Sequence, residues 1–271
     1  MSRVRSQWVA LFAISAALGA GTAEGSERDR VEPETARRTP EERTFVFGLD
    51  PNTPSRGVVT AESSLGLGSG VAALRPLPAA SDAHVPETSL TMSLGLGGGL
   101  APFVTGVRAF GEGAASSVGV VAGLRWQLTE AGAPLRVGLV GAAFREPGGA
   151  YGMSLRGAVT YDVERLRLGS NVLAERAFPG GRGARDALDV VVSAGASYRV
   201  LPGLRLGAEY VGQDLEELGG PGAEGGAKQY AGPTTAIELD RGRVQIVAGP
   251  AIGLGGNSAR WLGRASVVFS F

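Results

Sequence analysis

The sequence of Arg260–Phe271, RWLGRASVVFSF, decides the fold of this 271-residue chain. Its residues alternate between two faces with the period of two that is typical of a β-strand. One face is apolar and carries Trp261 and Phe269, whereas the other carries Leu262 and Arg264 among small and polar residues. We therefore expect a strand that has an apolar environment on one side and a more polar one on the other.

The same strand resembles the closing strand of bacterial outer-membrane β-barrel proteins, which is amphipathic and ends in an aromatic residue. The resemblance extends over about residues 57–271, is porin-like in the broad sense and matches no subfamily. It implies that Phe269 and Phe271 form the assembly signal recognised by the barrel-assembly machinery. It also implies contact with outer-membrane lipid in a Gram-negative-type bacterium, and it leaves the oligomeric state open.

The composition excludes several classes of function. The chain contains 44 glycines, no cysteine, and 26 basic against 26 acidic side chains. The lack of cysteine excludes disulfides, thiolate metal sites and a cysteine nucleophile. The balanced charge argues against nucleic acid as a partner. One all-β domain is a common solution for a chain of this length.

The N-terminal region predicts export. Met1–Ala23 has two arginines, an apolar run and a small-x-Ala pattern, which together are typical of a signal peptide. The apolar run Trp8–Ala20 has 13 residues, fewer than the roughly 20 that a transmembrane helix needs. Residues 24–56 are predicted to form a charged, disordered periplasmic leader, which precedes a barrel at 57–271.

From residue 57 the period of two continues to the end of the chain. The segments are about 9–14 residues long, which suits tilted membrane-spanning strands. The predicted strands are Gly57–Gly68, Thr88–Gly98, Pro102–Gly111, Ser116–Leu128, Leu135–Arg145, Ala150–Asp162, Arg165–Ala177, Ala187–Val200, Leu204–Gln213, Ala231–Leu239, Arg243–Leu254 and Arg260–Phe271. The predicted fold is an all-β, single-chain antiparallel transmembrane β-barrel of about 12 strands, with 10 strands as the second choice.

The connections support this topology. With the C-terminus on the periplasmic side, the short turns fall on that side of the membrane. The three longest connections, Ser69–Glu87, Phe178–Asp186 and Asp214–Tyr230, fall on the outer side. Outer-membrane barrels have this asymmetry between short periplasmic turns and long outer loops.

The charged face of each strand is expected to face the lumen, because a charge facing lipid near the midplane costs roughly 2–4 kcal/mol. Two interpretations remain open: a structural ladder of ion pairs, or a pore lining that selects ions. Arginine exceeds acid among these residues, so a pore would have a mild preference for anions. The predicted lumen-lining residues are Arg125, Arg136, Arg156, Arg167, Glu175, Asp189, Glu209 and Arg264.

Aromatic residues lie at the predicted strand ends, where amphipathic rings favour the headgroup layer. The predicted girdle consists of Trp126, Tyr161 and Tyr198 on the periplasmic side, and of Tyr151, Tyr210 and Trp261 on the outer side.

The sequence contains no convincing catalytic, cofactor or metal site. The single histidine, His84, lies in a loop beside Ser81 and Asp82, and Ser154 lacks a nucleophile-elbow pattern. Residues 220–225 match GxGxxG in letters alone, since they open no helix. No enzyme activity and no cofactor are therefore predicted. The expected function is a passive, porin-like channel for small solutes or ions; the alternative is a non-conducting structural or surface-interaction barrel.

Overall fold

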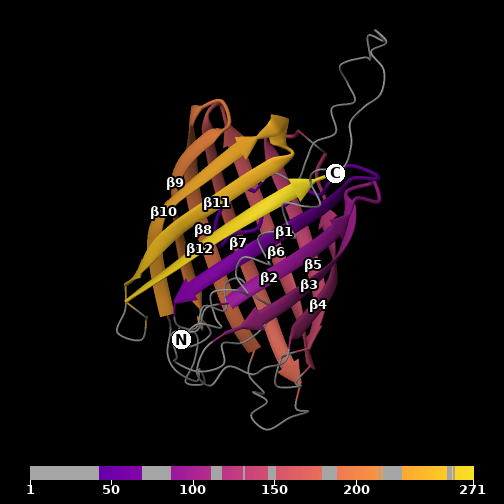
Figure 1. Cartoon of the computed structure of the whole chain (residues 1–271), viewed down its shortest axis with the longest axis vertical. Helices are drawn as coiled ribbons and strands as arrows, with labels where there is room; N and C mark the ends of the chain where they lie inside the picture. Colours follow the sequence, from indigo (N-terminus) through magenta and orange to yellow (C-terminus); the bar gives the residue numbers. More distant parts are fainter. Residues whose placement is uncertain are drawn as a thin grey trace, which may run out of the picture. The chain divides into compact units, whose positions relative to one another are not determined.

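Twelve antiparallel strands form a closed barrel (Figure 1), which confirms the predicted fold and strand number. The computed structural model describes residues 43–68, 87–110, 118–130, 132–145, 151–178, 188–213, 215, 228–254, 258 and 260–271. The predicted signal peptide, His84 and residues 220–225 lie outside these ranges. No helix in the described part of the chain has the length and hydropathy of a membrane span.

The strands follow one another around the wall in chain order, and β1 (Val59–Gly68) closes the barrel by pairing with both β2 and β12. Every strand therefore has two hydrogen-bonded neighbours, so no edge is left open. The other strands are β2 (Glu87–Leu94), β3 (Leu100–Ala109), β4 (Gly119–Gln127), β5 (Leu135–Arg145), β6 (Tyr151–Val163), β7 (Leu166–Phe178), β8 (Leu188–Leu201), β9 (Leu204–Gln213), β10 (Lys228–Leu239), β11 (Val244–Gly253) and β12 (Trp261–Ser270).

The bounds of β5 and β9 agree with the prediction, and the largest difference is at the end of β2. The prediction extends this strand to Gly98, whereas the structure ends it at Leu94. Gly97, Gly98 and Gly99 have φ angles of 87°, 62° and 73°, in the left-handed region that favours glycine. These three residues turn the chain into β3 instead of extending β2.

The connections differ in length between the two ends of the barrel. In a closed antiparallel barrel, all connections that follow even-numbered strands lie at one end. Those connections are short: β6 and β7 are joined by residues 164–165, and β8 and β9 by 202–203. We call this end the short-turn end. The connections at the opposite end include 69–86 and 214–227.

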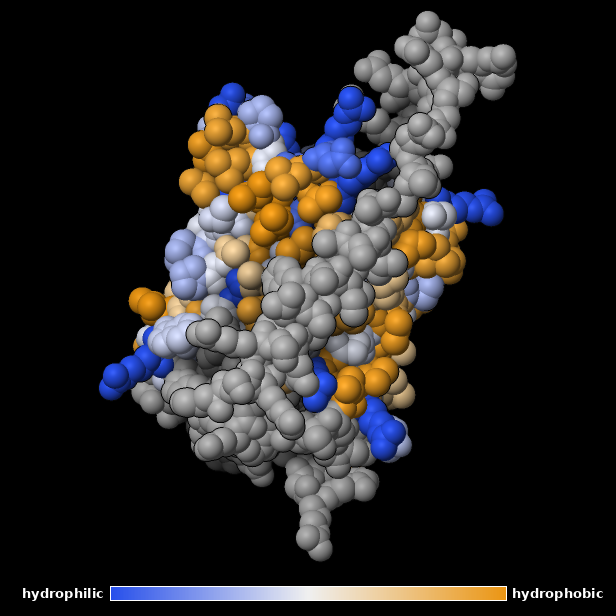
Figure 2. All heavy atoms as spheres, viewed as in Figure 1, coloured by the Kyte–Doolittle hydropathy of each residue, from blue (hydrophilic) through white to orange (hydrophobic). Residues whose placement is uncertain are grey.

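The outer face of the wall is apolar. Along β6, Met153, Leu155 and Val159 are all exposed, as are Leu168 and Val172 of β7. On the face shown in Figure 2, hydrophobic residues cover much of the described wall, and the most hydrophilic residues gather toward its ends. A surface of this kind suits contact with lipid tails.

A charge introduced at the middle of this outer face should destabilise the barrel. Val172→Arg, in the middle of β7, is expected to lower the free energy of unfolding by about 2–4 kcal/mol. Leu166→Arg, at the first residue of the same strand, should cost at most about 1 kcal/mol, because an arginine there can reach the headgroups. Denaturant unfolding of the protein in lipid vesicles measures both; equal losses would argue against a lipid-facing wall.

Candidate functional site

Residues 43–54, which precede β1, lie inside the barrel; we call them the lumen segment. Phe45, Val46 and Phe47 are 2%, 1% and 4% exposed, respectively. Val46 and Phe47 pack in one apolar cluster with inward-facing wall residues such as Leu173 and Val211. The sequence prediction placed these residues in a leader ahead of the barrel and not in its lumen.

Glu209 on β9 holds the middle of the lumen segment. Its carboxylate accepts hydrogen bonds from the backbone N–H groups of Val46 (2.8 Å), Phe47 (3.0 and 3.1 Å, one to each oxygen) and Gly48. Three consecutive N–H groups that converge on one carboxylate form an anion nest. The buried charge of Glu209 is therefore compensated by the backbone of the lumen segment.

Other polar side chains bind the lumen segment from different sides of the wall. Acceptors on β11, β7 and β4 and a donor on β12 contribute one backbone contact each. These contacts are Arg43 N to Gln245 Oε1 (2.6 Å), Leu49 N to Asn171 Oδ1 (3.0 Å), Thr53 N to Gln127 Oε1 (3.1 Å) and Arg264 Nη1 to the carbonyl of Val46 (3.4 Å). Hydrogen bonds from four strands fix the path of the backbone.

Both ends of the lumen segment lie at the short-turn end. Gln245 and Gln127, which bind the two ends, are the second residue of β11 and the last residue of β4. Asn171 and Glu209, which bind its middle, lie in the interiors of β7 and β9. The segment therefore enters the lumen, turns and leaves by the same end.

Glycines on the inner face make room for the ring of Phe45. A Cβ added to Gly195 of β8 would lie 2.7 Å from this ring, and one added to Gly169 of β7 would lie closer still. Similarly, a Cβ on Gly138 would lie 2.9 Å from Cβ of Pro51. The wall and the lumen segment are thus complementary in shape as well as in hydrogen bonding.

An ion-pair cluster joins the wall to the lumen segment near the short-turn end. Arg167 donates to both oxygens of Asp162 (2.7 and 3.0 Å). Arg136, on the inner face of β5, also donates to Asp162 (2.5 Å). Arg167 also donates to Thr44 Oγ1 (2.6 Å) and to Asp50 Oδ2 (3.3 Å). Arg167 is 2% exposed, so this cluster is part of the packed interior.

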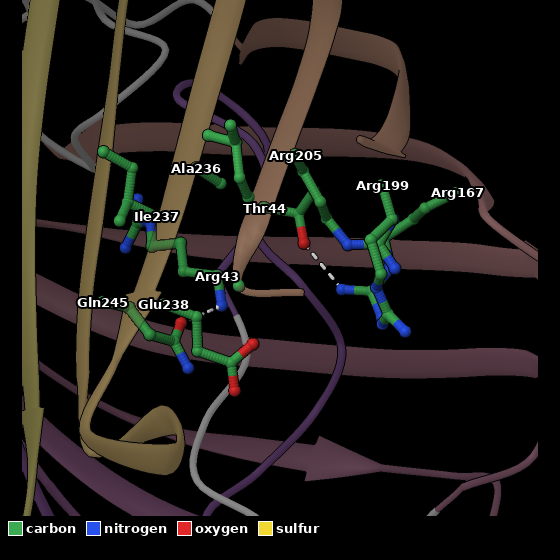
Figure 3. Close-up of a pocket in the computed structure, with 11 residues that line it drawn as sticks. Arg43, Thr44, Arg167, Arg199, Arg205, Ala236, Ile237, Glu238 and Gln245 are labelled. Atoms are coloured by element: carbon green, nitrogen blue, oxygen red, sulfur yellow. Dashed lines mark hydrogen bonds between the residues drawn. The ribbon is translucent and has the colours of Figure 1, made fainter. Parts of the chain in front are cut away.

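Among the described residues, two cavities between the wall and the lumen segment have charged linings. The first, of about 30 Å³, lies beside the β8–β9 turn and is lined by Arg43, Arg167, Arg199, Arg205 and Glu238 (Figure 3), among others. In Figure 3 several of these arginines approach one another around the hydrogen bond between Arg167 and Thr44. This cavity lies near the short-turn end.

The second cavity, of about 90 Å³, is the one we call the arginine cavity. Its charged lining consists of Arg43, Arg125, Arg156, Arg264 and Glu62. Glu62 pairs with Arg43, and its other oxygen lies 3.8 Å from Arg264. Arg43, the first residue of the lumen segment, lines both cavities.

The eight predicted lumen residues have buried or half-buried positions. Arg125, Arg136, Arg167, Glu175, Glu209 and Arg264 are buried, and Arg156 and Asp189 have intermediate exposure. The structure brings Arg125, Arg156 and Arg264 together around the arginine cavity, and Arg136 and Arg167 around Asp162. Their role in transport stays a prediction.

Sequence reasoning missed three charged residues that complete these clusters: Arg43, Asp50 and Glu62. It placed Asp162 on the polar face of its strand but did not include it among the lumen-lining residues. Glu62 also lies on a predicted strand, on the face that carries other polar residues, so the same alternation could have identified it. Arg43 and Asp50 belong to the lumen segment and had no such signal. No group of three or more His, Cys, Asp or Glu residues in the described ranges is arranged to hold a metal ion.

The predicted girdle and assembly residues lie on or near the outer face. Five girdle residues are about half exposed, and Tyr210 is less so. The rings of Phe269 and Phe271 stack with centroids 6.4 Å apart. Their roles at the headgroups and in assembly stay predictions. The six girdle residues are Trp126, Tyr151, Tyr161, Tyr198, Tyr210 and Trp261.

Solved outer-membrane channels have the same barrel. The KdgM porin, solved in complex with disordered oligogalacturonate, aligns with a TM-score of 0.53 and 9% identity, over 79% of this chain and 99% of that one. The fold is that of a porin-like outer-membrane barrel. The NanC porin aligns at 0.53 and 10% identity (78% and 98% coverage), and an outer-membrane channel from Pseudomonas putida F1 at 0.54 and 12% (82% and 98%). No protein-family model and no curated sequence matches the chain.

Proposed function

We propose that this porin-like barrel is a passive outer-membrane channel for small solutes or ions, and that its lumen segment limits the flow. The observation that carries the proposal is the pair of charged cavities, both lined by Arg43, inside a wall whose outer face is apolar. A polar interior and a lipid-facing exterior are the features that a water-filled passage needs. The fold shared with the KdgM and NanC porins supports the same function.

The proposed location is the outer membrane of a Gram-negative-type bacterium. The signal-peptide pattern of Met1–Ala23 would direct export. The closing strand β12, with Phe269 and Phe271, would then engage the barrel-assembly machinery. The apolar outer face supports insertion into lipid after that step.

A second candidate function, a non-conducting barrel, is favoured by the way in which the lumen segment is held. Side chains from five strands, among them Glu209 and Asn171, bind its backbone. A segment held so extensively would leave little passage while it stays in place. The two functions differ in whether the segment can leave the lumen.

Removing the lumen segment distinguishes the two functions. Deletion of residues 24–54 is expected to raise the single-channel conductance several-fold, because water and ions would fill the space that the segment occupies. Planar-bilayer recording of the refolded protein measures this change, with deletion of residues 24–42 as the matched control that keeps the segment. If the longer deletion gives no conductance steps while heat-modifiable gel mobility shows an intact barrel, the channel function is refuted.

A further inference from the structure

We propose that the arginine cavity is an equilibrium binding site for one small oxyanion, such as an inorganic phosphate or sulfate or a short carboxylate. This inference goes beyond the channel function and does not depend on it, because an anion can bind in the lumen of a barrel that conducts nothing. It follows from the charge, the hydrogen-bond donors and the size of the cavity.

The lining of the cavity carries more positive than negative charge. Four arginines and one glutamate line it, and they come from the lumen segment and from β1, β4, β6 and β12. Glu62, the only acid in the lining, interacts with Arg43, Arg264 and Arg125. Outside the lining, Glu87 also acts on Arg264, and Glu175 and Glu209 act on Arg156. Buried charges without full compensation are costly, so an anion in the cavity would stabilise the cluster.

The carboxylates that compensate Arg156 lie outside the lining. Arg43 and Arg125 act on it as like charges, and its opposite charges are Glu175 and Glu209, which lie outside the lining. Glu209 is already bound by three backbone N–H groups of the lumen segment. Its attraction for Arg156 is therefore shared with that backbone, which leaves Arg156 able to bind a further anion.

Hydrogen-bond donors are available beside the charge. Nε of Arg43 and Nε of Arg264 are buried and have no acceptor among the described residues. Guanidinium groups donate in a planar, forked geometry that matches the oxygens of carboxylates and phosphates. Ser89 and Thr91 of β2 also line the cavity, and their hydroxyl groups share hydrogen bonds with those of Ser64 and Thr105. The donor set is the one that oxyanions prefer.

The size of the cavity limits the ligand to a small molecule. At about 10–15 Å³ for each water molecule, the 90 Å³ space accommodates a phosphate, a sulfate or a short carboxylate. Phe103, Val107 and Val121 line another part of the cavity and would accept a short hydrocarbon stem. A carboxylate with such a stem and an inorganic oxyanion share the same recognition, and separate titrations distinguish them.

Isothermal titration of the full-length barrel in detergent tests the proposal. Sodium sulfate, phosphate and butyrate are titrated separately at constant ionic strength, with sodium chloride as the reference. We expect saturable binding of one oxyanion per chain. Arg156→Gln should weaken this binding roughly tenfold to a hundredfold, the range for one charge-assisted hydrogen-bonded contact.

Two further variants sharpen this experiment. Arg145→Gln removes an exposed arginine that lies over the Tyr151 ring and does not line the cavity. This substitution should leave the binding unchanged. Glu62→Gln removes the competing carboxylate and should tighten the binding. Stronger binding of butyrate than of sulfate would assign the site to carboxylates, and the reverse order to inorganic oxyanions.

Three results would overturn the proposal: no saturable heat with any of the oxyanions, chloride heats equal to those of the oxyanions, or equal affinity of Arg156→Gln and the unchanged protein. Heat-modifiable mobility confirms that each variant is folded. The titration does not depend on conductance. A titration without binding would therefore not argue against the channel function, and a bilayer recording without conductance steps would not argue against the binding site.

Discussion

Glu209→Gln is expected to release the lumen segment from the wall. The glutamine has the shape of the glutamate, but it presents an NH₂ group and no charge to three backbone N–H groups that now meet a carboxylate. Loss of charge-assisted hydrogen bonds of this kind costs on the order of 3 kcal/mol. The fraction of molecules with the segment outside the lumen should therefore rise about a hundredfold.

Thiol labelling measures this release directly, because the chain contains no cysteine. Val46→Cys places a single thiol at a position that is 1% exposed, so a maleimide should react slowly while the segment is in place. The same thiol in the Glu209→Gln background should react much faster. Glu130→Gln, at an exposed turn, is the matched control and should leave the rate unchanged. Equal rates in all three proteins would show that Glu209 does not hold the segment.

Gly169→Val should displace the Phe45 ring by steric overlap, whereas Glu209→Gln acts through the loss of a charge. Any Cβ at this position overlaps the Phe45 ring, and valine is well suited to a β-strand, so the wall can keep its structure. Phe45 would lose its buried position, which is worth about 2–3 kcal/mol for a phenylalanine side chain. We expect faster labelling of Val46→Cys and larger conductance steps.

Gly157→Val is the control for this substitution, because a Cβ on Gly157 of β6 meets nothing within 4 Å. Adding Phe45→Ala to Gly169→Val should restore slow labelling, since the smaller side chain vacates the space that the valine fills. The double mutant would then be closer to the unchanged protein than Gly169→Val is. Identical labelling rates of Gly169→Val and Gly157→Val would show that the fit of Phe45 beside Gly169 does not hold the segment in place.

The strands of the wall could be predicted because each has a local signal. Apolar and polar residues alternate with a period of two, and a charge on the lipid side is excluded by its cost. The same alternation placed Arg125 and Arg264 on the inner face. It could not show that Arg264 meets Glu62, or that Arg167 pairs with Asp162, because alternation defines a face and not a partner.

The lumen segment could not be predicted in this way, because its position depends on contacts between distant parts of the chain. Phe47 and Glu209, which share a hydrogen bond, are 162 residues apart. The ring of Phe45 fits beside Gly169 and Gly195, and in the sequence these glycines are only small residues of two strands. The one local hint was the apolar run Phe45–Val46–Phe47, which needs burial and has no partner in a disordered leader.

The path of the lumen segment, in and out by the short-turn end, has a mechanical consequence. A segment that crossed the barrel from end to end would have to be threaded before the wall closed. Here the contacts of Arg43 and Thr53 place both ends of the segment at the short-turn end, where β1 begins, so the segment can be withdrawn without separating any pair of strands. A pull on Arg43 would break the contacts of Gln245, Glu209 and Asn171 in succession. The force needed would be that of the strongest single contact, and the barrel would stay closed throughout.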